Sequence, residues 1–179
     1  MSIRDEVNGL CEQGRLFRLR PIFLDPGLRE RREIYVSEEV NARFSGPWDD
    51  PSVEIRCGRA QADLEAFVSR DPIVVARDPR RAGASYMSRL IPPRDEVWDI
   101  RSYDPTPGIR VLGRFAEKDV FIALTWEVRR LLNDFDSPEW RTAIRRCATA
   151  WINLFHVYEP LRGDYFADYI SDAIFDREP

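Results

Sequence analysis

Histidine is nearly absent from this sequence, and lysine is equally scarce. His156 is the only histidine, and Lys118 is the only lysine among 27 basic residues. A single imidazole excludes metal sites that need several histidines, and it leaves His156 as the only base for a Ser-His-Asp hydrolase. Lys118 lies in a sequence typical of a hairpin turn, where Schiff-base catalysis is not expected. Almost every cation is therefore an arginine, whose planar fork suits carboxylates and phosphates.

Cysteine and the common cofactor motifs are scarce as well. Cys11, Cys57 and Cys147 are widely spaced and include no Cys-x-x-Cys pair. This spacing excludes a disulfide framework and a zinc site of paired cysteines. The sequence also lacks a phosphate-binding loop, a dinucleotide fingerprint and a Gly-x-Ser-x-Gly elbow. We therefore expect neither a metal nor a cofactor.

Long hydrophobic segments are missing too. No apolar run approaches the ~18 residues of a membrane-spanning helix. Charges at Arg4, Asp5 and Glu6 occupy the place where a signal peptide is apolar. We therefore expect a cytoplasmic protein without membrane contact. The length of 179 residues and the 44% hydrophobic content are typical of a single domain over residues 1–179.

The charge balance argues against a general attraction to nucleic acid. The net charge is −4, and residues 131–179 carry 9 acidic residues against 5 arginines. The one clearly basic segment is 77–94, with 5 arginines against one aspartate. Any binding of nucleic acid would therefore depend on a local cluster of arginines.

Hydrophobic periodicity predicts an α+β fold with a mainly antiparallel, twisted sheet of about 4–5 strands flanked by helices. The clearest pattern is a meander of three strands at 97–101, 109–115 and 120–126. No periodic pattern assigns residues 1–35 as a whole, although 15–20 resembles a short strand. The other predicted elements are helices at 33–44 and 58–69, a strand at 73–76 and a long loop or broken helix at 77–94.

A pair of helices is predicted at the C-terminal end of the sequence. Ser137-Pro138 is a strong start for the first, and an apolar stripe continues to Phe155. The second is predicted at 164–175, and the pair is expected to cover one sheet face with four aromatic residues, Trp140, Trp151, Phe155 and Phe166.

Three aspartates recur at every fourth position of this second predicted helix. They are Asp164, Asp168 and Asp172, which would share one helical face. Such a face is most often a solvated surface. The functional alternatives are that it docks a basic partner or, less often, that it binds a hard cation.

Arginines on and around the predicted meander are the candidate site. Arg110 and Arg114 share one face of a strand, Arg101 precedes them, and Arg129-Arg130 follows the third strand. With Arg80 and Arg81 they would line a groove for phosphate or an RNA backbone. The alternative is that they pair with nearby acids, which are Asp95, Glu96, Asp99, Glu117, Asp119 and Glu127.

The meander resembles the RelE/ParE-like bacterial toxins, which include HigB-type proteins. The shared features are Trp98-Asp99-Ile100-Arg101, a strand opening at Arg110, and an apolar strand leading to Arg129-Arg130. The resemblance covers residues 94–130. It implies a small antiparallel sheet packed by helices, and cleavage of mRNA without a metal by arginines that hold the scissile phosphate.

Two functions follow from these observations. The first is a toxin-like RNA-binding protein, with endoribonuclease activity as the implied chemistry. In it Tyr86 and Arg101 are the catalytic candidates, and the substrate-binding candidates are Arg80, Arg81, Arg110, Arg114, Arg129 and Arg130. The second is a non-enzymatic interaction domain whose acidic helix docks a basic or antitoxin-like protein. The sequence does not decide whether the protein is an enzyme, and it does not give the oligomeric state.

Overall fold

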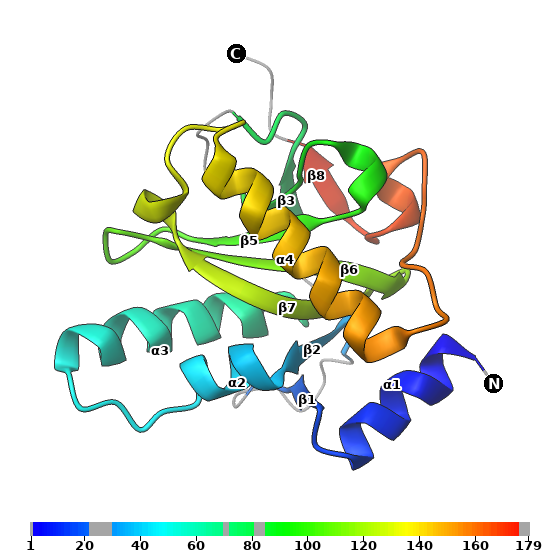
Figure 1. Ribbon diagram of the computed structural model, residues 1–179, viewed down its shortest axis with the longest axis horizontal. Helices are drawn as coiled ribbons and strands as arrows, with labels where there is room; N and C mark the ends of the chain where they lie inside the picture. The colour runs from blue at the N-terminus through cyan, green and yellow to red at the C-terminus, as the bar shows by residue number, and fades with distance from the viewer. Residues whose placement is uncertain (1, 22–29, 70–71, 81–84, 176–179) are drawn as a thin grey trace.

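The structure is a computed structural model that describes residues 2–21, 30–69, 72–80 and 85–175. In these residues one mixed sheet of eight strands is combined with four α-helices (Figure 1). The prediction of a mainly antiparallel sheet of 4–5 strands was therefore wrong, although the fold remains α+β. The strand order is β1-β2-β7-β6-β5-β4-β3-β8. Parallel pairs join β2 to β7, β3 to β4 and β3 to β8, and the other pairs are antiparallel.

The bounds of the elements follow the chain. The strands are β1 (Leu16–Leu19), β2 (Glu33–Ser37), β3 (Ile73–Ala76), β4 (Met87–Arg89), β5 (Trp98–Ser102), β6 (Ile109–Glu117), β7 (Val120–Val128) and β8 (Ala173–Phe175). The helices are α1 (Ile3–Glu12), α2 (Glu38–Phe44), α3 (Pro51–Ala66) and α4 (Pro138–Phe155). Three short 3₁₀ helices are η1 (Pro93–Asp95), η2 (Arg129–Leu132) and η3 (Phe166–Asp168).

The predicted meander is present as β5, β6 and β7 in the middle of the sheet. Arg101 faces Arg110 across β5 and β6, and Arg110 faces Glu127 across β6 and β7. The pairing of β6 with β7 shifts between Leu112 and Gly113. A side chain at Gly113 would collide with a main-chain carbonyl of β7, so only glycine fits this irregular position.

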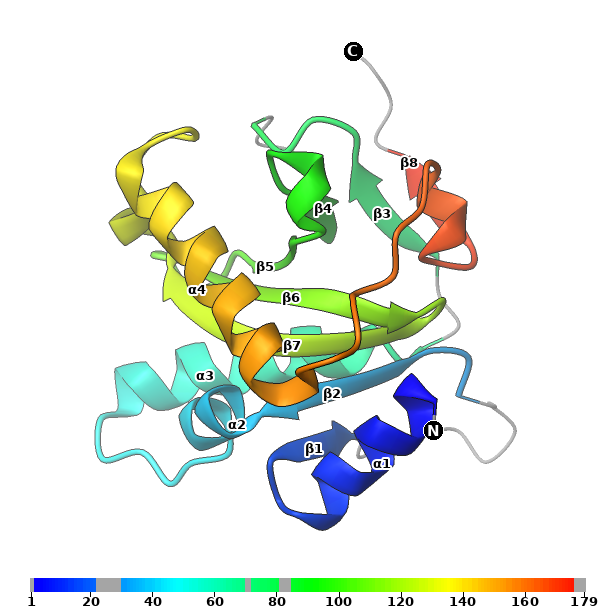
Figure 2. The same ribbon diagram turned by 45° about the vertical axis from the view of Figure 1, so that its right-hand side comes forward.

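Two predicted helices are replaced wholly or partly by strands. Residues 33–37 form β2, and only 38–44 form the helix α2. The predicted C-terminal helix at 164–175 was also wrong. That segment contains one 3₁₀ turn, η3, before it joins the sheet edge as β8. Figure 2 shows the chain running from the end of α4 along the sheet to β8. The segment 77–94 was expected to be a long loop or a broken helix. Its described residues, 77–80 and 85–94, contain β4 and the start of η1.

The two sheet faces have separate hydrophobic cores. On one face α4 crosses β6 and β7 (Figure 1), and Trp151 and Phe155 are buried with Val120 and Ile122, as predicted. The predicted start of α4 is also correct, because Ser137 accepts a hydrogen bond from the backbone N–H of Trp140 at 3.2 Å.

On the opposite face α2 and α3 cover the strands. The prediction that Phe166 joins the α4 face was wrong. Its ring meets Trp98 in this second core, with the ring centroids 5.6 Å apart.

None of the helices in the described part of the chain combines the length and the apolar character that a membrane span requires.

Candidate functional site

Arg101 and Arg110 lie side by side on the α4 face of the sheet, at the end where β6 begins. Both guanidinium groups contact the carboxylate of Asp99, which is fully buried. Arg101 Nε lies 3.2 Å from Asp99 Oδ2, and Arg110 Nε lies 3.5 Å from the same oxygen. Arg129 lies at the start of η2, and its positive charge lowers the pKa of Arg110. We call Arg101, Arg110 and Arg129 the arginine cluster.

Arg101 is fixed by the protein itself. Besides Asp99, it donates hydrogen bonds to Ser85 Oγ (2.7 Å), Ser88 Oγ (2.6 Å) and the carbonyl oxygen of Pro79 (3.1 Å). Burial acts against its charge, but Asp99 and Tyr103 together outweigh this effect and raise the pKa of Arg101. Because its three nitrogens already have acceptors, Arg101 is a structural cation and has no nitrogen without a partner to offer a phosphate.

Arg110 is held less completely. Burial lowers the pKa of its guanidinium, Asp99 compensates only in part, and repulsion from Arg101 and Arg129 adds to the shift. Its guanidinium carbon lies 5.1 Å from the centre of the Tyr103 ring, and this ring is 39% exposed. The positive charge of Arg110 is therefore only partly balanced within the protein, and it lies next to an exposed aromatic surface.

Arg129 and Arg130 follow directly at the end of β7. Arg129 donates to the carbonyl oxygen of Asn133 at 2.8 Å, and its guanidinium lies 5.8 Å from the Trp140 ring centre. No carboxylate of the described residues lies within ion-pair distance of Arg129 or Arg130. Arg130 is exposed. Both cations are thus available to an anion from solution.

Arg80 is exposed but is not free. It forms an ion pair with Asp136 at 3.0 Å, and a longer one of 3.9 Å with Asp78. The neighbouring candidate, Arg81, lies outside the described residues.

Arg114 does not belong to the cluster. Its side chain lies under α4, with the guanidinium carbon 5.9 Å from the centre of the Trp151 ring and a hydrogen bond to the carbonyl oxygen of Asp95. Burial lowers the pKa of this guanidinium. Because α4 covers the sheet here, Arg110 and Arg114 do not line one open groove.

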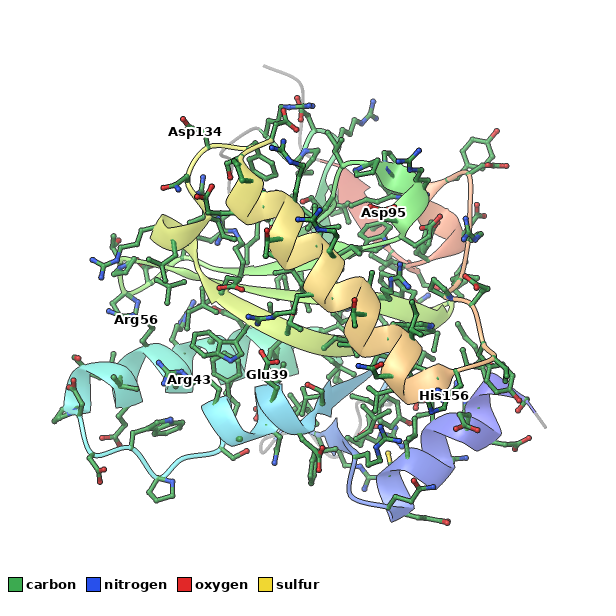
Figure 3. All side chains as sticks on the ribbon, in the orientation of Figure 1. Glu39, Arg43, Arg56, Asp95, Asp134 and His156 are labelled. Atoms are coloured by element: carbon green, nitrogen blue, oxygen red, sulfur yellow. The ribbon has the colours of Figure 1, made fainter. Side chains whose placement is uncertain are left out.

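The Tyr86 side chain also points away from the cluster, although the Tyr86 carbonyl oxygen accepts a hydrogen bond from the backbone N–H of Arg101 at 2.9 Å. The Tyr86 hydroxyl donates to the carbonyl oxygen of Asp63 on α3 at 2.5 Å, on the opposite sheet face. Burial raises the pKa of this hydroxyl. The structure therefore does not bring Tyr86 and the Arg101 guanidinium together. His156 is distant as well, because it caps the C-terminal end of α4, whereas Asp134 marks the end near the cluster (Figure 3).

The three aspartates of the alternative function do not share a helical face, because the predicted helix does not form. Asp172 forms an ion pair with Arg31, and Asp168 accepts from the backbone N–H of Tyr165 at 2.9 Å. Asp164 is exposed. The surface on which a basic partner was expected to dock is thus absent in that form.

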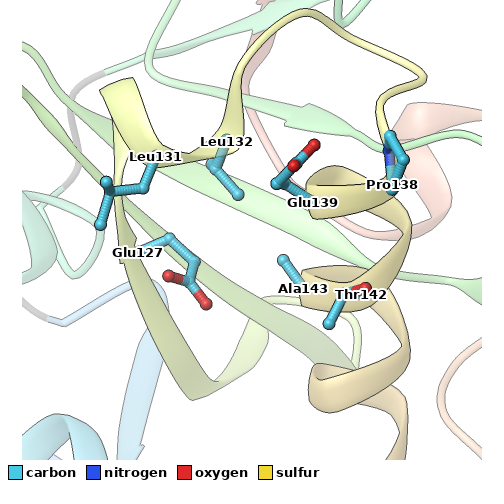
Figure 4. Close-up of a pocket in the computed structure, with 7 residues that line it drawn as sticks. All are labelled: Glu127, Leu131, Leu132, Pro138, Glu139, Thr142 and Ala143. Carbon is cyan, nitrogen blue, oxygen red and sulfur yellow. The ribbon is translucent and has the colours of Figure 1, made fainter.

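A cleft of about 290 Å³ opens between the end of β7 and the start of α4 (Figure 4). We call it the β7–α4 cleft. Its lining residues are Glu127, Leu131, Leu132, Pro138, Glu139, Thr142 and Ala143. Sequence reasoning treated Glu127 only as a possible partner of arginines. No local sequence pattern indicates the cleft, because its two walls come from different elements.

No family model, no curated protein and no solved structure matches the chain. Within the described ranges, no group of three or more histidine, cysteine, aspartate or glutamate side chains is placed to hold a metal ion. The function is therefore inferred from the site itself.

Proposed function

We propose that this chain binds single-stranded RNA through phosphate contacts at the arginine cluster, as its resemblance to RelE/ParE-like toxins implies. The charge balance of the cluster carries the proposal. Its three guanidinium groups have one carboxylate of the described residues, Asp99, within ion-pair distance. A partly buried excess of positive charge is costly unless an anion completes it.

The three arginines of the cluster have different roles, and these roles favour binding of an extended anion. Arg101 has its donors occupied and serves to hold Asp99. Arg110 is buried beside the partly exposed Tyr103 ring, with its charge incompletely balanced, and Arg129 is partly exposed. Arg130 extends the same positive surface by one residue. Several cations in a row suit successive phosphates of one strand, because each arginine binds phosphate oxygens through its fork.

The aromatic neighbour of Arg110 favours RNA with unpaired bases. Tyr103 presents a partly exposed ring beside a cation. Unpaired bases stack on such rings, whereas bases within a duplex are not accessible to them.

We do not extend the proposal to RNA cleavage. Its candidate for proton transfer, Tyr86, lies on the other face of the sheet and has its hydroxyl bonded to α3. Arg101 contributes to binding indirectly, by holding Asp99 in place for Arg110.

The test is a filter-binding titration of a short single-stranded RNA at several salt concentrations. Affinity should fall steeply as salt rises, because each phosphate contact releases counterions. Arg129→Ala and Arg110→Lys each remove or weaken one contact. We expect Arg129→Ala to lower the salt slope by about 0.7 to 1 unit.

The matched control is Arg59→Ala. Arg59 is an exposed arginine of α3, the helix on the opposite face, so this variant makes the same change of net charge. It should leave the slope unchanged. Absence of RNA binding by the unmodified protein at low salt would contradict the proposal, as would an equal loss in Arg59→Ala and Arg129→Ala.

A further inference from the structure

The β7–α4 cleft lies directly beside the proposed phosphate contacts. Arg129 and Arg130 begin η2, and the next two residues, Leu131 and Leu132, form one wall of the cleft. The guanidinium of Arg129 rests on Trp140, in the first turns of α4 that form the other wall. A nucleotide whose phosphate is held at Arg129 or Arg130 therefore has this cleft within reach of its base.

The chemistry of the walls excludes a phosphate and suits a flat ring. Glu127 and Glu139 place two carboxylates at the cleft, which repel an anion. Leu131, Leu132 and Ala143 supply apolar surface on which a ring can lie. The volume of about 290 Å³ has room for one base and leaves the cleft open to solvent.

Glu127 is the group that would recognise the base. Its side chain points into the space between β7 and α4 (Figure 4). Oε1 of this carboxylate pairs with Arg146 at 3.0 Å, and Arg146 also pairs with Glu39 at 2.8 Å, so two carboxylates share one cation. Burial raises the pKa of Glu127, with Arg146 acting in the opposite direction. The lone pairs of the Glu127 carboxylate that Arg146 does not use can still accept hydrogen bonds.

We propose that the β7–α4 cleft binds a guanine base of the RNA, with the Glu127 carboxylate accepting hydrogen bonds from its Watson–Crick edge. The inference rests on the proposed function, because the phosphates at the arginine cluster bring the base to the cleft. Guanine carries two adjacent donors on this edge, N1–H and the 2-amino group, which match the two oxygens of a carboxylate. Adenine and cytosine each offer one amino group next to an acceptor. Uracil offers one N–H between two carbonyl oxygens, and these oxygens repel the oxygens of the carboxylate.

The experiment measures fluorescence anisotropy with five labelled eight-nucleotide RNAs. One is all uridine, and the others carry a single central guanosine, adenosine, cytidine or inosine. We expect the guanosine RNA to bind about tenfold more tightly than the all-uridine RNA, the lower part of the range for a paired base contact because the cleft is open. Inosine keeps N1–H but lacks the 2-amino group, so its RNA should fall between these two.

Two glutamate variants separate base recognition from the surrounding ion pairs. Glu127→Gln keeps the shape but turns one acceptor into a donor, so the preference for guanosine should fall below about threefold. Glu39→Gln is the matched control, because Glu39 contacts the same Arg146 at 2.8 Å but does not line the cleft. This variant should retain the full preference.

The outcomes distinguish the two proposals. Equal affinity for all five RNAs, with salt-dependent binding retained, would overturn the guanine site and leave RNA binding intact. A guanosine preference that survives in Glu127→Gln, or that is lost equally in Glu39→Gln, would also overturn it. If no RNA binds at low salt, the proposed function fails and the guanine site fails with it.

Discussion

Arg101 and Arg110 occupy directly facing positions on β5 and β6, where two like charges ordinarily repel each other. The buried Asp99 carboxylate between them makes the arrangement stable. Asp99 also accepts hydrogen bonds from the backbone N–H of Ser88 at 3.1 Å and from Ser88 Oγ at 2.6 Å. One carboxylate therefore ties β4, β5 and β6 together on the α4 face.

Replacing Asp99 by Asn should be strongly destabilising. Two nearly buried guanidinium groups would lose their negative partner, and we expect a loss of about 3–5 kcal/mol in the free energy of unfolding. Urea unfolding followed by circular dichroism measures it. The control is Asp136→Asn, at the exposed ion pair with Arg80, which should cost at most about 1 kcal/mol. Equal costs for the two variants would contradict a special role for Asp99.

The aromatic contacts of α4 should dominate the stability of its face of the sheet. Trp151 and Phe155 are buried and stacked, with ring centroids 4.2 Å apart. Replacing either by Ala removes most of a large buried side chain and should cost about 3–5 kcal/mol. Ile152 lies between them in sequence but is 59% exposed, so Ile152→Ala should change stability by less than about 0.5 kcal/mol. A change within that smaller range for Trp151→Ala in urea unfolding would refute the packing.

The anchoring of α1 should depend on pH through Glu33. This carboxylate of β2 pairs with Arg4 of α1 at 2.8 Å and accepts from the Tyr35 hydroxyl at 2.6 Å. Burial opposes its charge, but the Tyr35 hydrogen bond and the charges of Arg4 and Arg18 outweigh this and hold the pKa of Glu33 below its ordinary value of 4.5. The stabilisation is therefore complete above that value and is lost as the pH falls through the lowered pKa.

Glu33→Gln should consequently cost about 1 kcal/mol at pH 7, and the difference from the original protein should shrink as the pH falls below 4.5. Urea unfolding at a series of pH values measures this. Glu12→Gln, an exposed change in α1, is the control and should show no such trend. A cost for Glu33→Gln that is the same at pH 3 and pH 7 would be inconsistent with this account.

The three cysteines should differ sharply in reactivity. Cys57 and Cys147 are fully buried, and burial raises the pKa of the Cys147 thiol to about 12. Cys11 is partly exposed at the end of α1. A thiol reagent at pH 8 should therefore modify one cysteine in the folded protein and three after unfolding in urea. Rapid modification of all three in the folded protein would contradict the buried positions.

The elements that sequence patterns located correctly are those stabilised by neighbours along the chain. The meander β5–β7 has alternating apolar residues and short turns, and α4 has a capping serine followed by proline. The signal for α1 was present as well. Ser2 and Asp5 form a reciprocal capping box, and Ile3, Val7, Leu10 and Cys11 follow at the spacing of an apolar helix stripe, so the sequence held a signal that the prediction missed.

The failures share a physical cause, which is pairing with distant strands. Residues 164–175 have apolar spacing that suits a helix, yet Tyr169 is fixed by a 2.6 Å hydrogen bond to the buried Glu96. Residues 173–175 then pair with β3, and no local sequence pattern predicts this pairing. The arginine cluster was located in part, because Arg101, Arg110 and Arg129 belong to the meander. The burial of Arg114 depends on α4, and the contact of the Tyr86 hydroxyl with the opposite face depends on α3. The strand pattern places neither helix.

The mixed order of the sheet has a consequence for how quickly the chain reaches this structure. The strands β5, β6 and β7 close short loops, whereas β2 finds β7, and β3 finds β8, only across long stretches of chain. Closing a long loop costs more entropy than closing a short one, and chains with many distant contacts fold slowly. We therefore expect the meander to form first as a nucleus. The long-range parallel pairings of β2 with β7 and of β3 with β8 then form late and set the overall rate.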